Sequence, residues 1–311
     1  MNDGVFVHER ALVEPGARIG AGTRVWAWAH ILGGAVIGRG CNICDQTFIE
    51  NEVVIGDRVT IKCGVQVWDG VRLDDDVFVG PNVTFTNDLF PRSKQRPERF
   101  APTHIRQGAS LGANSTILAG VVVGQYAMVG AGAVVTNNVP PHATVVGNPA
   151  VITGYVGKNG ERGPHKTDTE KIQDLNVRGA HILDFPLVRD LRGDLTFAEI
   201  HKPLPFVPQR VFTIFNVPTR KVRGEHAHRT LQQVLICITG SVSVMVDNGY
   251  ERGTVVLDAP VKALHISPMI WTAQFNYSPD ARLIVLASDV YKTDDYIRDY
   301  DRFLAEVRTR G

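Results

Sequence analysis

The sequence predicts an all-β protein in two parts: a parallel β-helix, then a β-barrel or jelly roll that ends in a helix. Large apolar residues recur at every sixth position within 13–140. After Pro149 the recurrence stops, and a polar, glycine-containing stretch follows. Beyond that stretch, short runs rich in valine, isoleucine and phenylalanine alternate with turns. We therefore expect domains at 1–156 and 175–311, joined by a linker at 157–174.

Two series of side chains carry the six-residue period. A large apolar residue opens each repeat, and a small or β-branched residue stands four positions later. Strand alternation has period two and cannot place a large residue at every sixth position. A short strand followed by a turn, with three such units in each triangular coil, explains both series. The large series reads Val13, Ile19, Val25, Ile31, Ile37, Ile43, Ile49, Ile55, Ile61, Val67, Leu73, Val79 and Phe85, and resumes at Ile105, Leu111, Ile117, Val123, Val129 and Val135.

The part after the linker is predicted to be a barrel or jelly roll because no helical segment separates its short apolar runs. The Asp-Asn-Gly at 247–249 is a hairpin signal between two such runs. The last segment, TDDYIRDYDRFLAEVRTR, has acidic residues first and basic residues last. That order suits the dipole of a C-terminal helix.

Composition excludes several function classes. The chain has a formal net charge of +1 and is 44% hydrophobic, which argues against disorder and against nucleic-acid binding. It has no apolar run of membrane-spanning length, and MNDGVFVHER lacks the features of a signal peptide. We expect a cytoplasmic protein that does not bind membranes. Its four cysteines are expected to be free thiols.

The period fails once, at 86–104, where TNDLFPRSKQRPERFAPTH intervenes. A perfect repeat has no pocket, so this interruption is the candidate site. Its basic side chains suit the phosphates of a nucleotide-sugar or of coenzyme A. The alternative is a solvated loop that wraps a neighbouring subunit. The charged residues of this loop are Arg92, Lys94, Arg96 and Arg99, with Asp88 and Glu98 opposing them.

The stretch IRQGASLGANSTILAGVVVGQYAMVGAGAVVTNNVPPHATVVGNPA at 105–150 resembles the hexapeptide-repeat acyltransferases that use acetyl-CoA on nucleotide-linked amino sugars. The resemblance implies a left-handed β-helix, a trimer and an active site between two subunits. It implies that Asn87 orients the amine of the sugar and that Asp88 supports it. Arg92, from the basic side chains of the loop, is a candidate substrate contact. His104 is an alternative general base.

By the same resemblance, acetyl-CoA lies along the coils of 112–148, mostly against backbone. Candidate contacts are Gly112, Ala113, Gly130 and Ala131, and a backbone N–H near Gly112 or Ala131 could receive the developing oxyanion.

In the second part, RGEHAHRTLQQVLICITG places His226 and His228 before a strand and a glycine turn, which resembles the first cupin motif. Metal-binding cupins add a glutamate and, later, another histidine; these positions hold Gln233 and Ala273. We therefore expect no metal here. Two adjacent histidines without a metal suit proton transfer near neutral pH. The alternative is that both are buried for structural reasons.

Residues 178–305 resemble the dTDP-4-keto-6-deoxyglucose 3,4-ketoisomerases in the stretches RGDLTFAEI, PFVPQRVFTIFNV, RGEHAHR, QQVLICITGSVSV and LASDVYKTDDYIRDYDRFL. The resemblance implies that His228 removes the proton from sugar C3 and that His226 moves the hydroxyl proton. Phe212 and Thr213 stand where this family often has tyrosines. Further candidate substrate contacts are Arg192, Arg210, Arg223, Gln233 and Trp271, of which the arginines could hold a diphosphate.

Together the two resemblances imply a bifunctional enzyme. One half would isomerise the 4-keto sugar to the 3-keto sugar, and the other would acetylate a dTDP-3-amino-3,6-dideoxyhexose made by a separate pyridoxal-phosphate (PLP) aminotransferase. The alternative is a β-helical trimerisation scaffold carrying a sugar-binding or isomerase-only barrel. A trimer or a hexamer with three-fold dihedral symmetry is expected. The galacto or gluco configuration of the sugar and the identity of the acyl group stay open.

Overall fold

A computed structural model of the chain describes residues 4–95, 97–156, 175–191, 193–218 and 221–310. It forms two compact units, 1–156 and 157–311, which are taken in turn below. The predicted linker at 157–174 lies outside the described residues, and so does Arg192.

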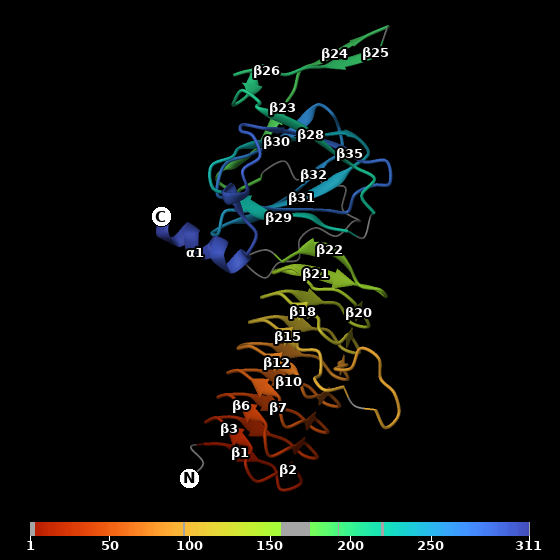
Figure 1. Cartoon of the computed structure of the whole chain (residues 1–311), viewed down its shortest axis with the longest axis vertical. Coiled ribbons are helices and arrows are strands. Elements are labelled where there is room, and N and C mark those ends of the chain that lie inside the picture. Colours follow the sequence, from red (N-terminus) through yellow and green to blue (C-terminus); the bar gives the residue numbers. More distant parts are fainter. Residues whose placement is uncertain (1–3, 96, 157–174, 192, 219–220, 311) are drawn as a thin grey trace. The chain divides into compact units, whose positions relative to one another are not determined.

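The first unit is a parallel β-solenoid whose very short strands fall into three sheets (Figure 1). Thr60 pairs with Asn42 one coil below and with Phe78 one coil above, so a coil takes 18 residues, or three hexapeptides. This confirms the predicted repeat. In order across each sheet, the strands are β1 (Phe6–Val7), β4 (Arg24–Val25), β7 (Asn42–Ile43), β10 (Thr60–Ile61), β13 (Phe78–Val79), β16 (Ser110–Leu111), β19 (Met128–Val129), β21 (Ala143–Val146) and β22 (Val151–Tyr155); β2 (Leu12–Val13), β5 (His30–Ile31), β8 (Phe48–Ile49), β11 (Gln66–Val67), β14 (Thr84–Phe85), β17 (Thr116–Ile117) and β20 (Val134–Val135); and β18 (Val122–Val123), β15 (Thr103–Ile105), β12 (Val71–Leu73), β9 (Val54–Ile55), β6 (Val36–Ile37) and β3 (Arg18–Ile19).

The large series fills the interior of the prism. From Val25 onward its members are buried, and Ile31, Ile61 and Val67 are fully so. Val13 and Ile19 are only half-buried because β2 and β3 each pair with a strand on one side. From Thr23 onward the small series is buried at the corners, where a large side chain would push the coils apart.

The interruption of the repeat is an excursion of 86–102 that stands out from the coils between β14 and β15 (Figure 1). The sequence period had placed its end at 104. The chain rejoins the stack earlier, because Thr103 and His104 already pair with Val71 and Arg72 of the coil below. At its base, the Ala101 amide donates to the Asn87 carbonyl at 3.2 Å, which brings the two ends of the excursion together.

The second unit contains two five-stranded antiparallel sheets that enclose an apolar core, as expected of a jelly roll. Their inward side chains include Leu235 and Leu283 from one sheet and Val244 and Val246 from the other. In order, the sheets are β23 (Ala180–Asp184), β33 (Lys262–Ile266), β30 (Gln233–Thr239), β35 (Arg282–Ala287) and β28 (Arg210–Phe215); and β32 (Arg252–Leu257), β31 (Val242–Asp247), β34 (Trp271–Phe275), β29 (Arg223–His228) and β36 (Tyr296–Ile297). The remaining elements are the ribbons β24 (Leu187–Asp190) with β25 (Gly193–Thr196) and β26 (Glu199–Ile200) with β27 (Pro203–Leu204), the 3₁₀ turn η1 (Thr293–Asp295) and the helix α1 (Tyr300–Arg310).

The predicted C-terminal helix is α1, and the predicted hairpin joins β31 to β32. The helix is held by a buried polar contact: the Tyr300 hydroxyl donates to Asp247 Oδ2 at 2.7 Å, and Arg252 donates to both side chains. Phe303, on the buried face of the helix, is fully buried. Among the described residues, no helix has the length and hydropathy needed to cross a bilayer.

Replacing Ile61 by alanine should destabilise the prism by about 2–5 kcal/mol, because the side chain is fully buried and the stacked coils cannot collapse into the cavity. Ile61→Val should cost only about 1 kcal/mol. Chemical unfolding of the full chain, followed by circular dichroism, measures both. A near-equal loss of unfolding free energy in the two variants would contradict the close packing described above.

Candidate active sites

The histidine pair of the second unit lies on β29, which is distorted beside it. The register of β29 against β34 shifts between Gly224 and His226, and Glu225 between them has φ 52°. A Cβ on Gly224 would lie 2.9 Å from the Thr272 carbonyl oxygen, so the close approach of β34 requires glycine there. After this bulge His226 lies opposite Thr272, and Thr272 lies opposite the inward-facing Val246. Both histidines are therefore on the inner face of the sheet.

His228 forms a dyad with Asp295. Its Nδ1 lies 2.9 Å from Asp295 Oδ2, and both side chains are more than nine-tenths buried. The other carboxylate oxygen accepts hydrogen bonds from the Thr230 amide at 2.8 Å and the Thr230 hydroxyl at 2.7 Å. Burial alone would raise the pKa of Asp295, but the hydrogen bonds from Thr230 and His228 bring that pKa below its usual value. A charged Asp295 accepts Nδ1–H, which leaves the His228 Nε2 lone pair available.

The two histidines are neutral at neutral pH. Burial, and next the nearby His226, lower the pKa of His228 from 6.5 to about 4. Burial also lowers the pKa of His226, whose Nδ1 donates to the Gly224 carbonyl at 2.8 Å. Their rings stand 5.0 Å apart at 89°, and the Tyr296 ring contacts both. Two neutral imidazoles, each with Nε2 unprotonated, can accept and pass on a proton.

Arginines surround the pair. Arg210 lies over the rings of Phe212 and Tyr291, at 5.0 and 5.6 Å, and its buried Nε has no hydrogen-bond partner among the described residues. Arg298 lies 4.3 Å over the Tyr296 ring. Burial is the largest cause of the lowered pKa of both histidines. The positive charge of Arg298 lowers the pKa of His226 further, and that of Arg210 lowers the pKa of His228 further. The site can therefore receive an anionic group beside two neutral bases.

The structure brings together only part of the predicted set. Gln233 Nε2 lies 3.4 Å from His228 Nε2, at the position where the metal-binding motif has glutamate. Arg223 lies on the same strand, opposite Gln274. Trp271 instead packs its ring against Tyr300 and Phe303 of α1, on the face of β34 opposite to that of Thr272. It belongs to the contact between β34 and α1, not to the histidine site.

The sequence interpretation missed Asp295, Tyr296 and Arg298. They lie in LASDVYKTDDYIRDYDRFL, which matches the ketoisomerases but was interpreted only as the approach to a helix. The signal available was the acidic pair Asp294 and Asp295, and nothing in the sequence says which of the two reaches His228.

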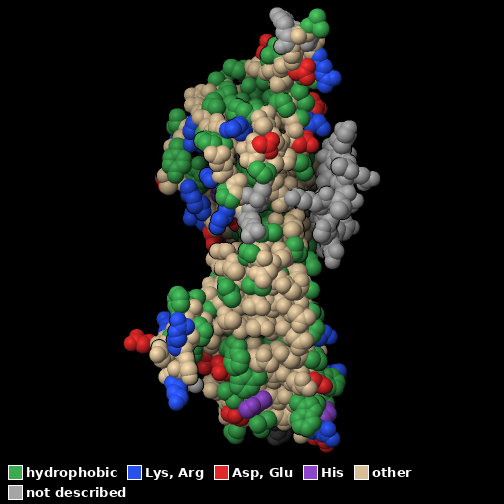
Figure 2. Space-filling view, turned by 90° about the vertical axis from the view of Figure 1, so that its right-hand side faces the viewer, with side chains coloured by type: hydrophobic (Ala, Val, Ile, Leu, Met, Phe, Trp, Pro, Cys, Tyr) green, Lys and Arg blue, Asp and Glu red, His purple; other side chains and the backbone are tan. Residues whose placement is uncertain are grey.

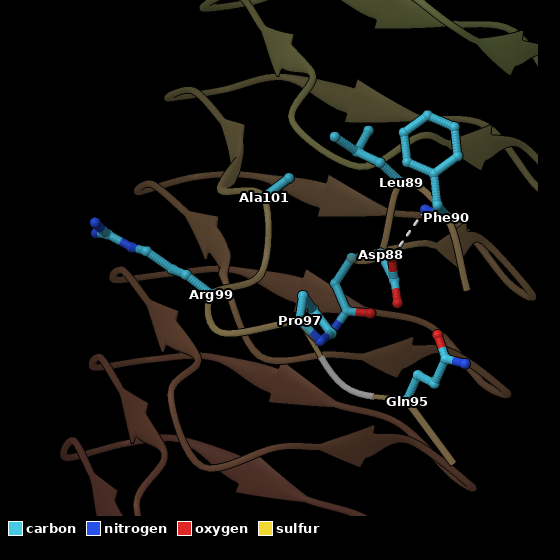
Figure 3. Close-up of a pocket in the computed structure, with 8 residues that line it drawn as sticks. Asp88, Leu89, Phe90, Gln95, Pro97, Arg99 and Ala101 are labelled. Carbon is cyan, nitrogen blue, oxygen red and sulfur yellow. Dashed lines mark hydrogen bonds between the residues drawn. The ribbon is translucent and has the colours of Figure 1, made fainter. Parts of the chain in front are cut away.

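In the first unit, a hollow of about 380 Å³ lies at the excursion (Figure 3). Asn87 Nδ2 donates to the Asp69 carbonyl at 3.1 Å, and Asp88 Oδ1 accepts from the Phe90 amide at 2.8 Å. Figure 2 shows the excursion clear of the coils, with Lys and Arg side chains gathered on it, and Arg92 is exposed. The lining residues are Asn87, Asp88, Leu89, Phe90, Gln95, Pro97, Arg99 and Ala101.

The four predicted acetyl-CoA contacts lie at a different corner of the prism, because Gly112 and Gly130 follow strands of the sheet that contains β16 and β19, whereas Asn87 follows β14. A Cβ on Gly112 would lie 2.5 Å from the Ala131 amide nitrogen. Within the described residues, the Ala113 and Ala131 amides donate to no protein acceptor, whereas Gly112 donates to the Val129 carbonyl. Backbone donors are thus available there.

His104, the alternative base, lies on β15 with Nε2 2.6 Å from Asp74 Oδ1, and is partly exposed. In the part of the chain that the structure describes, no group of three or more histidine, cysteine or acidic side chains is arranged to hold a metal ion.

Comparisons with known proteins match the two units separately. The bacterial transferase hexapeptide (six repeats) model matches 16–51, 52–87 and 102–137, and the FdtA model, described as WxcM-like, C-terminal, matches 178–308. A TDP-4-oxo-6-deoxy-α-D-glucose-3,4-oxoisomerase of Aneurinibacillus thermoaerophilus is 40% identical over 39% of this chain and 88% of its own length. A dTDP-3-amino-3,6-dideoxy-α-D-galactopyranose 3-N-acetyltransferase of the same organism is 59% identical over 49% of this chain and 78% of its own. A solved 3,4-ketoisomerase from Helicobacter canadensis is 39% identical, covers 42% of this chain and 97% of its own, and has a TM-score of 0.41.

Titration of the His228 ring, followed by NMR of labelled histidine, should give a pKa of about 4, not the ordinary 6.5. Asp295→Asn should lower that pKa further, because the charge and hydrogen bond of Asp295 favour the protonated ring. A wild-type value near 6.5, or an increase in the variant, would contradict the buried dyad.

Proposed function

Because the chain belongs to the hexapeptide-repeat transferases through its first unit and to the FdtA (WxcM-like) 3,4-ketoisomerase family through its second, we propose that it catalyses two steps in the synthesis of one dTDP-linked sugar. The second unit isomerises dTDP-4-keto-6-deoxyglucose to the 3-keto sugar. The first transfers acetyl from acetyl-CoA to the 3-amino group of a dTDP-3-amino-3,6-dideoxyhexose.

The isomerisation is assigned to the two histidines. The C3 hydrogen of the substrate is acidic because it stands beside the C4 carbonyl. His228 removes it through Nε2, and Asp295 stabilises the imidazolium that forms. His226 moves the proton of the C3 hydroxyl to the C4 oxygen of the resulting enediolate. Return of the proton from the His228 imidazolium to C4 then leaves the carbonyl at C3 and a hydroxyl at C4. No net oxidation occurs. The buried His228–Asp295 dyad is the observation that carries this assignment.

Substrate binding in the second unit is assigned to the arginines near the histidine pair. We assign Arg210, Arg223 and Arg298 to the diphosphate. The buried Nε of Arg210, which has no hydrogen-bond partner among the described residues, supports its role. Gln233 donates toward the His228 ring or toward the sugar. Arg192 stays a candidate from the sequence alone.

The acetyl transfer is assigned to the excursion and the corner glycines. The amine, oriented by Asn87 and Asp88, attacks the thioester carbonyl, and the tetrahedral oxyanion accepts a hydrogen bond from a backbone N–H near Ala131. The C–S bond then breaks, and the thiolate of coenzyme A leaves and takes up the proton that the amine loses. Asn87 and Ala131 occupy different corners of one chain, which supports a site completed by a second subunit. A trimer, or a hexamer that also pairs the second units, is therefore proposed.

Between the two steps, the 3-keto sugar must become an amine, which is a transamination, so we place a separate PLP aminotransferase between them. The acetyltransferase relative, 59% identical, acts on a galacto-configured amine, which favours dTDP-3-acetamido-3,6-dideoxygalactose as the product. Since these reactants are metabolites of the cytoplasm, we place the enzyme there. Mass spectrometry of products from the 4-keto sugar, an aminotransferase and acetyl-CoA tests the whole sequence.

His228→Asn should slow isomerisation by about 10²–10⁴-fold because the variant has no base at C3. Acetyl transfer should stay at the wild-type rate. Proton NMR in D₂O measures both conversion and exchange at C3. His226→Asn is the matched control: it should keep C3 exchange while slowing product formation. If only His226→Asn lost the exchange, the two roles would have to be interchanged.

Asn87→Ala should lower acetyl transfer by about 10²-fold through poorer positioning of the amine, with isomerisation unchanged. Release of free thiol from acetyl-CoA in the presence of the dTDP-3-amino sugar measures it. Asn51→Ala, which changes an asparagine at the same corner of an earlier coil, is the control. Equal rates of acetyl transfer by the wild type and Asn87→Ala would show that the site does not lie at the excursion.

A further inference from the structure

We propose that Arg229 and Glu306 are positioning residues of the isomerase, through which the C-terminal helix α1 sets the placement of Asp295 on His228. The inference rests on the proposed function of the second unit. It concerns residues that face away from the histidine ring and that neither the sequence interpretation nor the mechanism above uses.

Arg229 binds the segment that carries Asp295 at three consecutive residues. Its guanidinium Nη1 donates to the Asp294 carbonyl at 2.6 Å and to the Tyr296 carbonyl at 3.1 Å. Its own amide donates to the Asp295 carbonyl at 2.9 Å. Because Arg229 directly follows His228 on the chain, both partners of the dyad are fixed to one side chain and its backbone.

Glu306 of α1 fixes Arg229 in turn. Its carboxylate oxygens accept from Arg229 Nε at 2.9 Å and Nη2 at 2.5 Å, a bidentate pair that holds the guanidinium plane. The two side chains are 20% and 24% exposed, so water screens this pair only in part. The hydrogen bonds from Arg229 lower the pKa of Glu306 more than burial raises it. Glu306 is therefore ionised, and the pair stays charged at neutral pH.

The helix itself is firmly placed. Phe303 is fully buried, and Tyr300 donates to the buried Asp247. A contiguous chain of contacts therefore runs from the core under α1 through Glu306 and Arg229 to the backbone on both sides of Asp295. A shift in that backbone moves the carboxylate that orients the base, and misplacement of a catalytic group by about 1 Å can cost about 10²-fold in rate.

This chain of contacts, called the relay below, predicts a change in the pH dependence of isomerisation when it is broken. The charged and titratable groups that face His228 are His226 on its own strand, Asp295 on η1 and Arg210 on β28, with the Tyr296 ring of β36 against it. Of these, only Asp295 favours the protonated ring. If Asp295 is held less firmly against the ring, the pKa of His228 falls. The acid limb of the plot of isomerisation rate against pH then moves to lower pH, and the plateau rate falls.

The test is Glu306→Gln in the full chain, with Arg229→Lys as a second variant that keeps the charge but cannot bridge the same acceptors. We expect kcat for isomerisation to fall by about 10-fold with KM changed by less than about 2-fold, the acid limb to shift downward, and acetyl transfer to be unchanged. Arg302→Gln is the matched control: Arg302 contacts the same Glu306 oxygen at 3.0 Å from an exposed position, and its loss should leave kcat and the pH profile at wild-type values.

Wild-type kcat and pH profile in both Glu306→Gln and Arg229→Lys would overturn the proposal. So would a loss of kcat without any shift of the acid limb, since that is the effect of lower stability alone. If the wild-type chain did not isomerise the 4-keto sugar, the proposed function would fail instead. The His228 pKa read by NMR in Glu306→Gln would then still decide the relay, an unchanged value overturning it.

Discussion

Backbone groups in the short strands of the first unit must find their partners in a neighbouring coil, because strands of two or three residues cannot pair within their own coil. This constraint sets the 18-residue spacing, since Asn42, Thr60 and Phe78 must stand in register for their amides and carbonyls to meet. It also sets the side chains. Inward positions must fill a narrow triangular interior, and corner positions must be small enough for the next coil to approach.

The chemistry that we propose for the two units is located in opposite ways. In the prism it is placed outside the regular structure, on an excursion and on backbone amides at a corner. In the second unit it is placed inside, where a bulge in β29 turns two histidines toward the interior. Burial there removes their charge at neutral pH, and it makes the position of Asp295 matter, because a buried carboxylate must be held by its hydrogen bonds. The surrounding contacts, from Thr230 to Glu306, can be understood as meeting that requirement.

The sequence predicted those features that repeat or that depend on neighbours in the chain. The period located nearly every strand of the prism, and hairpin and helix signals located the β31–β32 turn and α1. It placed the return of the excursion two residues late, because the pairing of Thr103 with Val71 is a contact between coils that no local pattern announces. It missed Asp295 for the same reason: the carboxylate comes from a segment 67 residues beyond His228. Trp271 was placed in the site because of its neighbourhood in sequence, whereas strand alternation turns it toward α1.

The closed base of the excursion has an evolutionary consequence. Because Asn87 and Ala101 meet there by a backbone hydrogen bond, the segment between them can change in length or composition without altering the register of a single coil. In the regular coils, an insertion that is not a multiple of six residues would shift the inward side chains that follow it out of their positions. Under the proposed function, selection for new acceptor sugars can therefore act on this one segment, while the regular coils stay restricted in length.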